Sequence, residues 1–96
     1  MRIIAIDDEA KALNVLKTAI TDAIPRVDAR YYRDSAVALA DIKNGFIPDV
    51  VFLDIEMPEI SGVELAAKLK TEFPNTNIVF VTAYTGYAMD SLKLRA

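Results

Sequence analysis

Two short apolar runs that each end in aspartate are the feature of this sequence that most limits its fold. Residues 3–6 are apolar and are followed by Asp7 and Asp8. Residues 50–53 are apolar and are followed by Asp54. Runs of this kind are typical of strands that are buried on both faces of a parallel sheet. Open parallel sheets bind ligands beyond the carboxyl ends of their strands, so the three carboxylates should meet there if the two strands are neighbours.

Three carboxylates in one place repel one another. At least one of them would take up a proton unless a cation lies beside them. Mg2+ is a hard cation that prefers oxygen ligands, and it is the natural partner of such a cluster. The sequence therefore favours a metal-assisted phosphate site as the function.

The whole chain alternates strand and helix patterns. Four strands are expected, at residues 2–6, 27–32, 49–53 and 77–82. The second has mixed polarity, which predicts an edge position. Helices are expected at residues 9–23, 61–72 and 87–96, and one more between a cap at Asp34 or Ser35 and a left-handed end at Asn44-Gly45. Strands joined by helices imply right-handed crossovers, so the predicted fold is an open, doubly wound parallel α/β sheet.

Apolar residues at helical spacing predict which face each helix turns toward the sheet. In the first helix they are Ala12, Leu13, Leu16, Ala19, Ile20 and Ala23. In the second they are Val37, Leu39, Ala40 and Ile42, and in the third Val63, Leu65, Ala66, Leu69 and Phe73. Asp7 or Asp8 is expected to cap the first helix.

Composition argues against several classes of function. A chain of 96 residues is expected to form one small domain. It has no cysteine and no histidine, which removes disulfides, thiolate metal sites and imidazole chemistry. A net charge of −3 without a dense basic cluster argues against nucleic-acid binding by this segment. No apolar run approaches the roughly 20 residues of a membrane span, so a cytoplasmic location without membrane contact is expected.

Three segments of the chain resemble the receiver domains of two-component response regulators. They are Ile3-Ile4-Ala5-Ile6-Asp7-Asp8-Glu9, then Val51-Phe52-Leu53-Asp54-Ile55-Glu56-Met57-Pro58 with Gly62, then Val79-Phe80-Val81-Thr82-Ala83. Their order, spacing and placement at strand ends agree with that family over the whole chain. The resemblance implies a flavodoxin-like fold and a bacterial phosphorelay protein. Such a protein receives a phosphoryl group from a sensor histidine kinase with Mg2+ and switches an attached output domain that controls transcription.

The resemblance also implies roles for single residues. Asp54 would be the phosphoacceptor, and Thr82 would supply the hydroxyl that bonds the phosphoryl group. Mg2+ would be held directly by Asp8, largely through water by Asp7, by the backbone carbonyl of Glu56 and by Asp54. For the Glu56 side chain, an effect on phosphoryl lifetime and a plain solvated acid are equally open.

Residues around these positions are expected to shape the site. Ala83 leaves room near the phosphate, and Gly62 supplies a backbone conformation or close packing. Tyr84 lies where a side chain gates access, although Tyr84 and Tyr87 could equally be exposed loop aromatics. Thr82-Ala83-Tyr84 with Tyr87-Ala88 looks most like the receivers that precede LytTR-type DNA-binding domains.

The family has five βα units, and this chain supplies four. Residues 1–96 are therefore expected to be a receiver cut before its last unit, which in the family carries an active-site lysine and a switch aromatic. Lys93 is not that lysine, because it precedes the place of the fifth strand. Without that unit, residues 78–81 would form an apolar edge and the first helix would be uncovered, so self-association through both is expected. The alternative is that the fourth helix covers this surface within one chain.

Two other classes of function were weighed. A haloacid-dehalogenase-like phosphatase also has a strand-end aspartate with Mg2+, but it expects a second aspartate two residues after the first-strand nucleophile, and position 9 is Glu9. A pseudo-receiver that only makes protein contacts would not need Asp7, Asp8 and Asp54 together, which argues against this class for the parent protein. The expected truncation argues for it in this fragment, which would then bind metal without switching. The chain is thus expected to be a signalling switch and not an enzyme.

Overall fold

The fold is a four-stranded parallel sheet between helices, in a computed structural model that describes residues 1–57 and 60–81. The strands are β1 (Arg2–Ile6), β2 (Asp28–Tyr32), β3 (Val50–Asp54) and β4 (Asn77–Val81). The helices are α1 (Ala10–Ala23), α2 (Ser35–Lys43) and α3 (Gly62–Glu72). The predicted helix at 87–96 falls outside the described residues, as do Pro58, Thr82, Ala83, Tyr84 and Tyr87.

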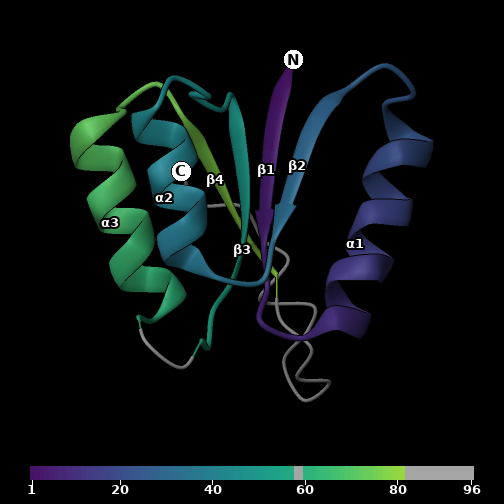
Figure 1. Ribbon diagram of the computed structural model, residues 1–96, viewed down its shortest axis with the longest axis horizontal. Helices are drawn as coiled ribbons and strands as arrows, with labels where there is room; N and C mark the ends of the chain where they lie inside the picture. The colour runs from purple at the N-terminus through teal and green to yellow at the C-terminus, as the bar shows by residue number, and fades with distance from the viewer. Residues whose placement is uncertain (58–59, 82–96) are drawn as a thin grey trace.

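The strand order is β2-β1-β3-β4, so β1 and β3 are neighbours inside the sheet and β2 lies at an edge. Helix α1 covers one face, and α2 and α3 cover the other (Figure 1). Both the doubly wound parallel architecture and the edge position of β2 are confirmed. Within the described part of the chain, none of the helices has the length and apolarity that a membrane span requires.

The two central strands form the core because both of their faces are covered. Ile4 and Ile6 contribute to the cluster under α2 and α3, whereas Ile3 and Ala5 pack on the α1 side. All four side chains are at most 1% exposed. This two-sided burial is the reason that β1 is apolar at every position and does not alternate.

Helix α2 buries a different face from the one predicted. Ile42 is buried and Leu39 is partly buried as expected, but Val37 and Ala40 are exposed. The positions that face the sheet are Ser35, Ala38 and Ile42, spaced by three and four residues. Ser35 and Ala38 are small, and Ser35 is polar, so the apolar spacing of the sequence did not indicate this face.

The inward faces of α1 and α3 are confirmed in their central positions. In α1, Ile20 is buried and Leu13 and Leu16 pack against its cluster, while Ala19 and Ala23 are exposed. In α3, the buried residues include Leu65, Ala66 and Leu69, and Phe73 packs against them. Val63 is 59% exposed, because it lies in the first turn on the side away from the sheet.

Two of the helix ends agree with their sequence signals. The Asp34 side chain accepts the Ala36 N–H at 2.8 Å and caps α2. Gly45, directly after the C-cap Asn44, has φ +117°, which glycine adopts at little cost.

The predicted cap of α1 is wrong. Glu9 occupies the N-cap position and makes no side-chain capping bond. Asp7 accepts the Glu9 N–H at 2.9 Å just before the helix, and the carboxylates of Asp7 and Asp8 lie beside Asp54.

Candidate functional site

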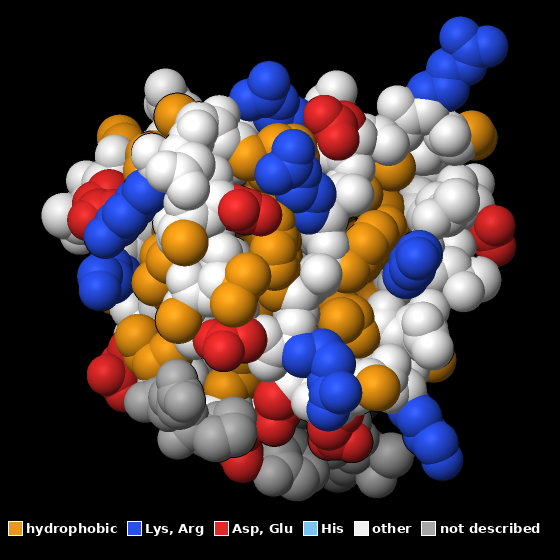
Figure 2. All heavy atoms as spheres, viewed as in Figure 1, with side chains coloured by type: hydrophobic (Ala, Val, Ile, Leu, Met, Phe, Trp, Pro, Cys, Tyr) orange, Lys and Arg blue, Asp and Glu red, His pale blue; other side chains and the backbone are white. Residues whose placement is uncertain are grey.

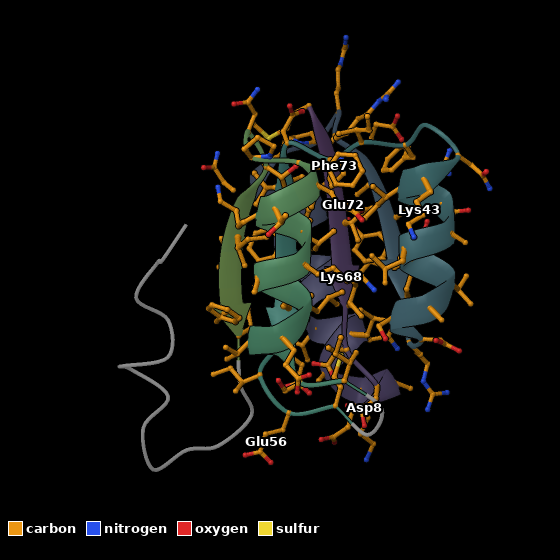
Figure 3. All side chains as sticks on the ribbon, turned by 90° about the vertical axis from the view of Figure 1, so that its left-hand side faces the viewer. Asp8, Lys43, Glu56, Lys68, Glu72 and Phe73 are labelled. Carbon is orange, nitrogen blue, oxygen red and sulfur yellow. The ribbon has the colours of Figure 1, made fainter. Side chains whose placement is uncertain are left out.

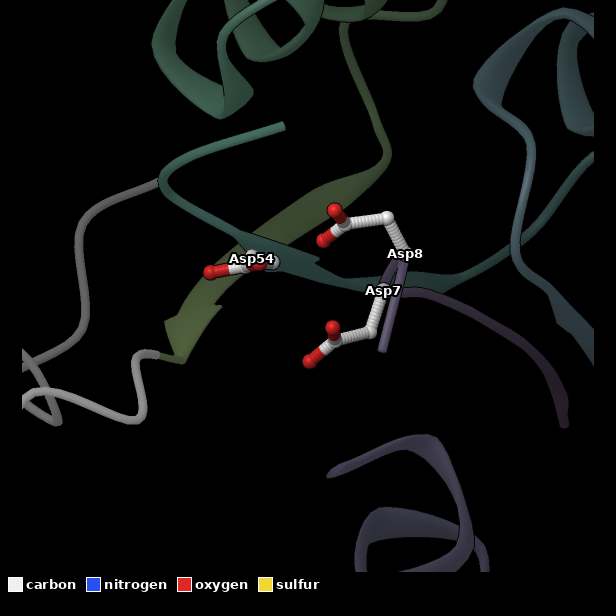
Figure 4. A group of neighbouring side chains, drawn as sticks. All are labelled: Asp7, Asp8 and Asp54. Carbon is white, nitrogen blue, oxygen red and sulfur yellow. The ribbon is translucent and has the colours of Figure 1, made fainter. Parts of the chain in front are cut away.

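Three aspartates converge at the carboxyl ends of β1 and β3. The register pairs Ile6 with Leu53, so Asp7 follows β1 at the level of Asp54, the last residue of β3. One carboxylate oxygen from each of Asp7, Asp8 and Asp54 lies within 4.8 Å of the others. Figure 4 shows the three carboxylates pointing to the same side, beyond the ends of the strands. The convergence that the sequence predicted for neighbouring strands is therefore present.

Asp7 is the most deeply buried of the three, with 6% of its surface exposed. Its backbone N–H donates to the Tyr32 carbonyl at 3.0 Å, and its Oδ1 accepts the Glu9 N–H at 2.9 Å. Burial raises the pKa of the Asp7 carboxyl, and the negative charges of Asp8 and Glu9 raise it further. The hydrogen bond from Glu9 opposes this increase only in part.

The pKa of Asp54 is shifted further than that of Asp7. Burial, followed by the negative charge of Asp7, raises its pKa to about 6. The Glu56 N–H lies 3.4 Å from Asp54 Oδ1 and favours the ionised form, but it does not offset the two opposing effects. The carboxyl of Asp54 is thus a stronger base than an ordinary aspartate.

The loop after β3 is tied closely to the strand end. The Gly62 N–H donates to the Ile55 carbonyl at 2.8 Å, and Ser61 caps α3 by accepting the Glu64 N–H at 3.1 Å. A Cβ at position 62 would lie 2.1 Å from the Asp54 carbonyl oxygen, which no side chain tolerates. The expectation that Gly62 provides close packing is confirmed, and this packing fixes the backbone of Asp54.

Glu56 and Asp8 lie at the same end of the molecule, and Phe73 lies at the opposite end (Figure 3). The Glu56 side chain is exposed and points away from the body of the protein. Several acidic side chains gather at this end of the face shown in Figure 2, next to the carboxyl ends of the strands. Among the described residues, Asp8 and Asp54 are partly exposed at this acidic end of the molecule.

The donor set fits a hard divalent cation. It consists of carboxylate oxygens, and sequence composition excludes imidazole and thiolate ligands. The raised pKa values of Asp7 and Asp54 show that these charges are poorly compensated within the protein. A divalent cation would supply the missing positive charge, as Mg2+ does among oxygen ligands.

Sequence reasoning missed one residue beside this cluster. The Arg33 guanidinium donates from Nε and Nη2 to the Asp8 carbonyl oxygen, at 3.2 and 3.1 Å. Arg33 directly follows β2, the strand that lies beside β1. The sequence signal that could have identified Arg33 is a cationic residue directly after a strand. Because all strands of a parallel sheet end at the same edge, such a residue after the neighbour of β1 lies close to Asp7 and Asp8.

Comparisons with known proteins converge on one family. The family model of the response regulator receiver domain matches residues 3–96. The transcriptional regulatory protein NatR of Bacillus subtilis is 38% identical over 90 residues, which cover 93% of this chain and 38% of NatR. The sensory transduction protein LytT of Enterococcus faecalis is 31% identical over 96 residues, which cover 100% of this chain and 39% of LytT. The chain thus spans less than half the length of these relatives.

A solved structure gives the same result for the fold. The response regulator protein TrrA of Thermotoga maritima, solved in complex with Mg(2+)-BeF, matches with a TM-score of 0.76 and 32% identity. The match covers 93% of this chain and 75% of TrrA.

Proposed function

Because this chain belongs to the response regulator receiver family, we propose that it accepts a phosphoryl group on Asp54 from a histidine of a sensor kinase. The phosphorylated chain then switches an attached output domain. The observation that carries this proposal is the convergence of Asp7, Asp8 and Asp54 within 4.8 Å at the carboxyl ends of β1 and β3. A strand-end carboxylate beside two further acids is a suitable acceptor in cation-assisted phosphoryl transfer.

In the proposed transfer, an ionised Asp54 oxygen attacks the phosphorus of a phosphohistidine. The new O–P bond forms an acyl phosphate as the N–P bond breaks, and the imidazole nitrogen keeps the electron pair and takes up a proton. The Glu56 N–H, 3.4 Å from Oδ1, helps to orient the Asp54 carboxylate for this attack. A bound divalent cation would hold Asp54 in its ionised, nucleophilic form at neutral pH.

We assign the cation site to Asp7, Asp8, Asp54 and the Glu56 backbone carbonyl, and we propose that it takes Mg2+. When bound, Mg2+ would offset the repulsion among the carboxylates and the charge of the phosphoryl group. The Mg(2+)-BeF complex of TrrA supports this choice of ion. Thr82, outside the described residues, is proposed to bond the phosphoryl group through its hydroxyl.

The relatives support a proposal for the wider protein. NatR is named a transcriptional regulatory protein and LytT a sensory transduction protein, and both are longer than this chain. We propose that residues 1–96 serve as the phosphoacceptor domain of a cytoplasmic, LytTR-type transcriptional regulator. Contact with DNA is assigned to an output domain, since this segment carries a net charge of −3.

A second copy of the chain is proposed as a further partner, through the outer edge of β4 and the side of α1. Strand β4 is the outermost described strand beside β3, and Val79, Phe80 and Val81 are only partly buried. On α1, Val15 is 71% exposed, and Ile20 is the one fully buried residue of that helix. Apolar edges and patches of this kind favour association. Sedimentation over a wide concentration range tests this, and a monomer at every concentration would contradict it.

The phosphoacceptor is tested by treating the protein with acetyl phosphate and Mg2+ and measuring its intact mass. The expected result is one phosphoryl adduct that is labile to hydroxylamine, and none in Asp54→Asn. Asp22→Asn, near the far end of α1, is the matched control and should keep the adduct. An adduct that persists in Asp54→Asn would show that another residue is the acceptor.

A further inference from the structure

The side chain of Arg33 joins the end of β2 to the backbone of Asp8. Its Nε and Nη2 both donate to the Asp8 carbonyl oxygen, at 3.2 and 3.1 Å, across 25 positions of the sequence. Hydrogen bonds from a charged donor are stronger than those between neutral groups. The fork of the guanidinium also restricts direction, because two donors must reach one oxygen.

The base of the Arg33 side chain is held on both sides. The preceding residue, Tyr32, pairs with Ile6 across the sheet and accepts the Asp7 N–H at 3.0 Å. The following residue, Asp34, caps α2. The guanidinium therefore extends from a backbone that has little freedom to move.

Asp8, in contrast, lies in the short connection between β1 and α1. Helix α1 makes its first backbone bond from Leu13 to the Glu9 carbonyl, one residue after Asp8. The peptide that joins Asp8 to Glu9 is thus outside both the sheet and the helix. The Arg33 fork holds its carbonyl oxygen, and Asp7 Oδ1 accepts its N–H at 2.9 Å. A displacement of the Asp8 backbone would move the Asp8 side chain away from Asp7 and Asp54.

We propose that Arg33 is a positioning residue of the cation site, which orients the Asp8 peptide so that the Asp8 carboxylate faces Asp7 and Asp54. This inference rests on the proposed function of the three aspartates. Arg33 acts through Asp8, and it makes no contact with the cation in this proposal.

Geometry and charge predict opposite effects for the loss of Arg33. As a positive charge near three carboxylates, Arg33 weakens the attraction for a divalent cation, so its removal alone would tighten binding. As the group that orients Asp8, it strengthens binding, so its removal would weaken it. Groups that orient metal ligands contribute about tenfold or more to affinity. We therefore expect the geometric effect to be the larger one.

The test is calorimetric titration of the purified protein with Mg2+ alone. Arg33→Gln removes the charge and the fork, and Arg33→Lys keeps the charge but replaces the fork by a single ammonium group. Both should weaken Mg2+ binding by about tenfold. Arg26→Gln, in the connection between α1 and β2 at the other end of the sheet, is the matched loss of charge and should bind like the wild type.

A double-mutant cycle with Asp8→Ala separates positioning from other roles. In the Asp8→Ala background, Arg33→Gln should have no further effect, since the carboxylate that it orients is absent. Mg2+ affinity in Arg33→Gln equal to or tighter than the wild type would overturn the proposal, as would wild-type affinity in Arg33→Lys. A lowered melting temperature with unchanged Mg2+ affinity would also overturn it. If wild type and Asp8→Ala bind Mg2+ equally, the proposed cation site itself fails.

Discussion

Asp54→Asn is expected to stabilise the metal-free protein at neutral pH. In the folded chain, burial and the charge of Asp7 raise the pKa of Asp54 from its ordinary value of 3.8 to about 6. An ionised Asp54 therefore costs about 3 kcal/mol of stability above pH 7, at about 1.4 kcal/mol for each pKa unit. Because Asp54 is partly exposed, screening by solvent reduces this figure, and a gain of about 1–2 kcal/mol is expected for the neutral, isosteric asparagine.

The raised pKa of Asp54 also determines how the stability of the fold depends on pH. Because the pKa of Asp54 is higher in the folded than in the unfolded state, the folded state binds more protons between pH 4 and 6. The stability contributed by the protonated group is fully present below about pH 4 and is lost as the pH rises through about 6. The pKa of Asp7 is raised as well, so the wild type loses stability steeply over this window and Asp54→Asn loses less.

Urea denaturation in chelator-containing buffer at several pH values from 4 to 8 measures both effects. The difference between Asp54→Asn and wild type should be largest at pH 7 to 8 and small at pH 4. Addition of Mg2+ should narrow this stability difference, because the cation binds more tightly to the chain that retains all three carboxylates and stabilises it more. Asp22→Asn on α1 is the matched control and should follow the wild type. A mutant that is no more stable than the wild type at pH 7.5, or a difference that does not depend on pH, would refute the electrostatic reasoning.

Three further substitutions test other parts of the site and its scaffold. Asp8→Ala should weaken Mg2+ binding more than loss of Asp7 or Asp54, because it removes the proposed direct ligand; equal affinities for wild type and Asp8→Ala in calorimetry would contradict this. Gly62→Ala should destabilise the fold by about 3 kcal/mol, since its Cβ would lie 2.1 Å from the Asp54 carbonyl oxygen. An unchanged urea midpoint would mean that the connection between β3 and α3 can shift to accommodate the methyl group without loss of stability. Asp34→Ala should cost about 1 kcal/mol through loss of the α2 cap, and an unchanged melting temperature would count against that bond.

Local signals in the sequence were sufficient to predict the helices and strands of the described residues and to identify the three aspartates of the candidate site. A strand that is buried on both faces must be apolar throughout, so residues 3–6 and 50–53 could be recognised without any long-range information. The helix ends at Asp34 and Gly45 follow from side-chain capping and from a positive φ, which are properties of a few adjacent residues. For the same reason, the aspartates at strand ends stood out as the candidate site.

The tertiary structure decided what depends on residues far apart in the chain. The sequence could state only that Asp7 and Asp54 meet if their strands are neighbours, and the adjacency and register of β1 and β3 are properties of the assembled sheet. The buried face of α2 was predicted wrongly because it includes a serine and a small alanine, Ser35 and Ala38, whose burial depends on how the helix packs on the sheet. Arg33 reaches Asp8 because β2 lies beside β1, and the pKa of Asp54 is raised because burial and a neighbouring charge coincide. Hydrogen bonding, desolvation and Coulomb repulsion act through space, so their partners are settled only when the chain has folded.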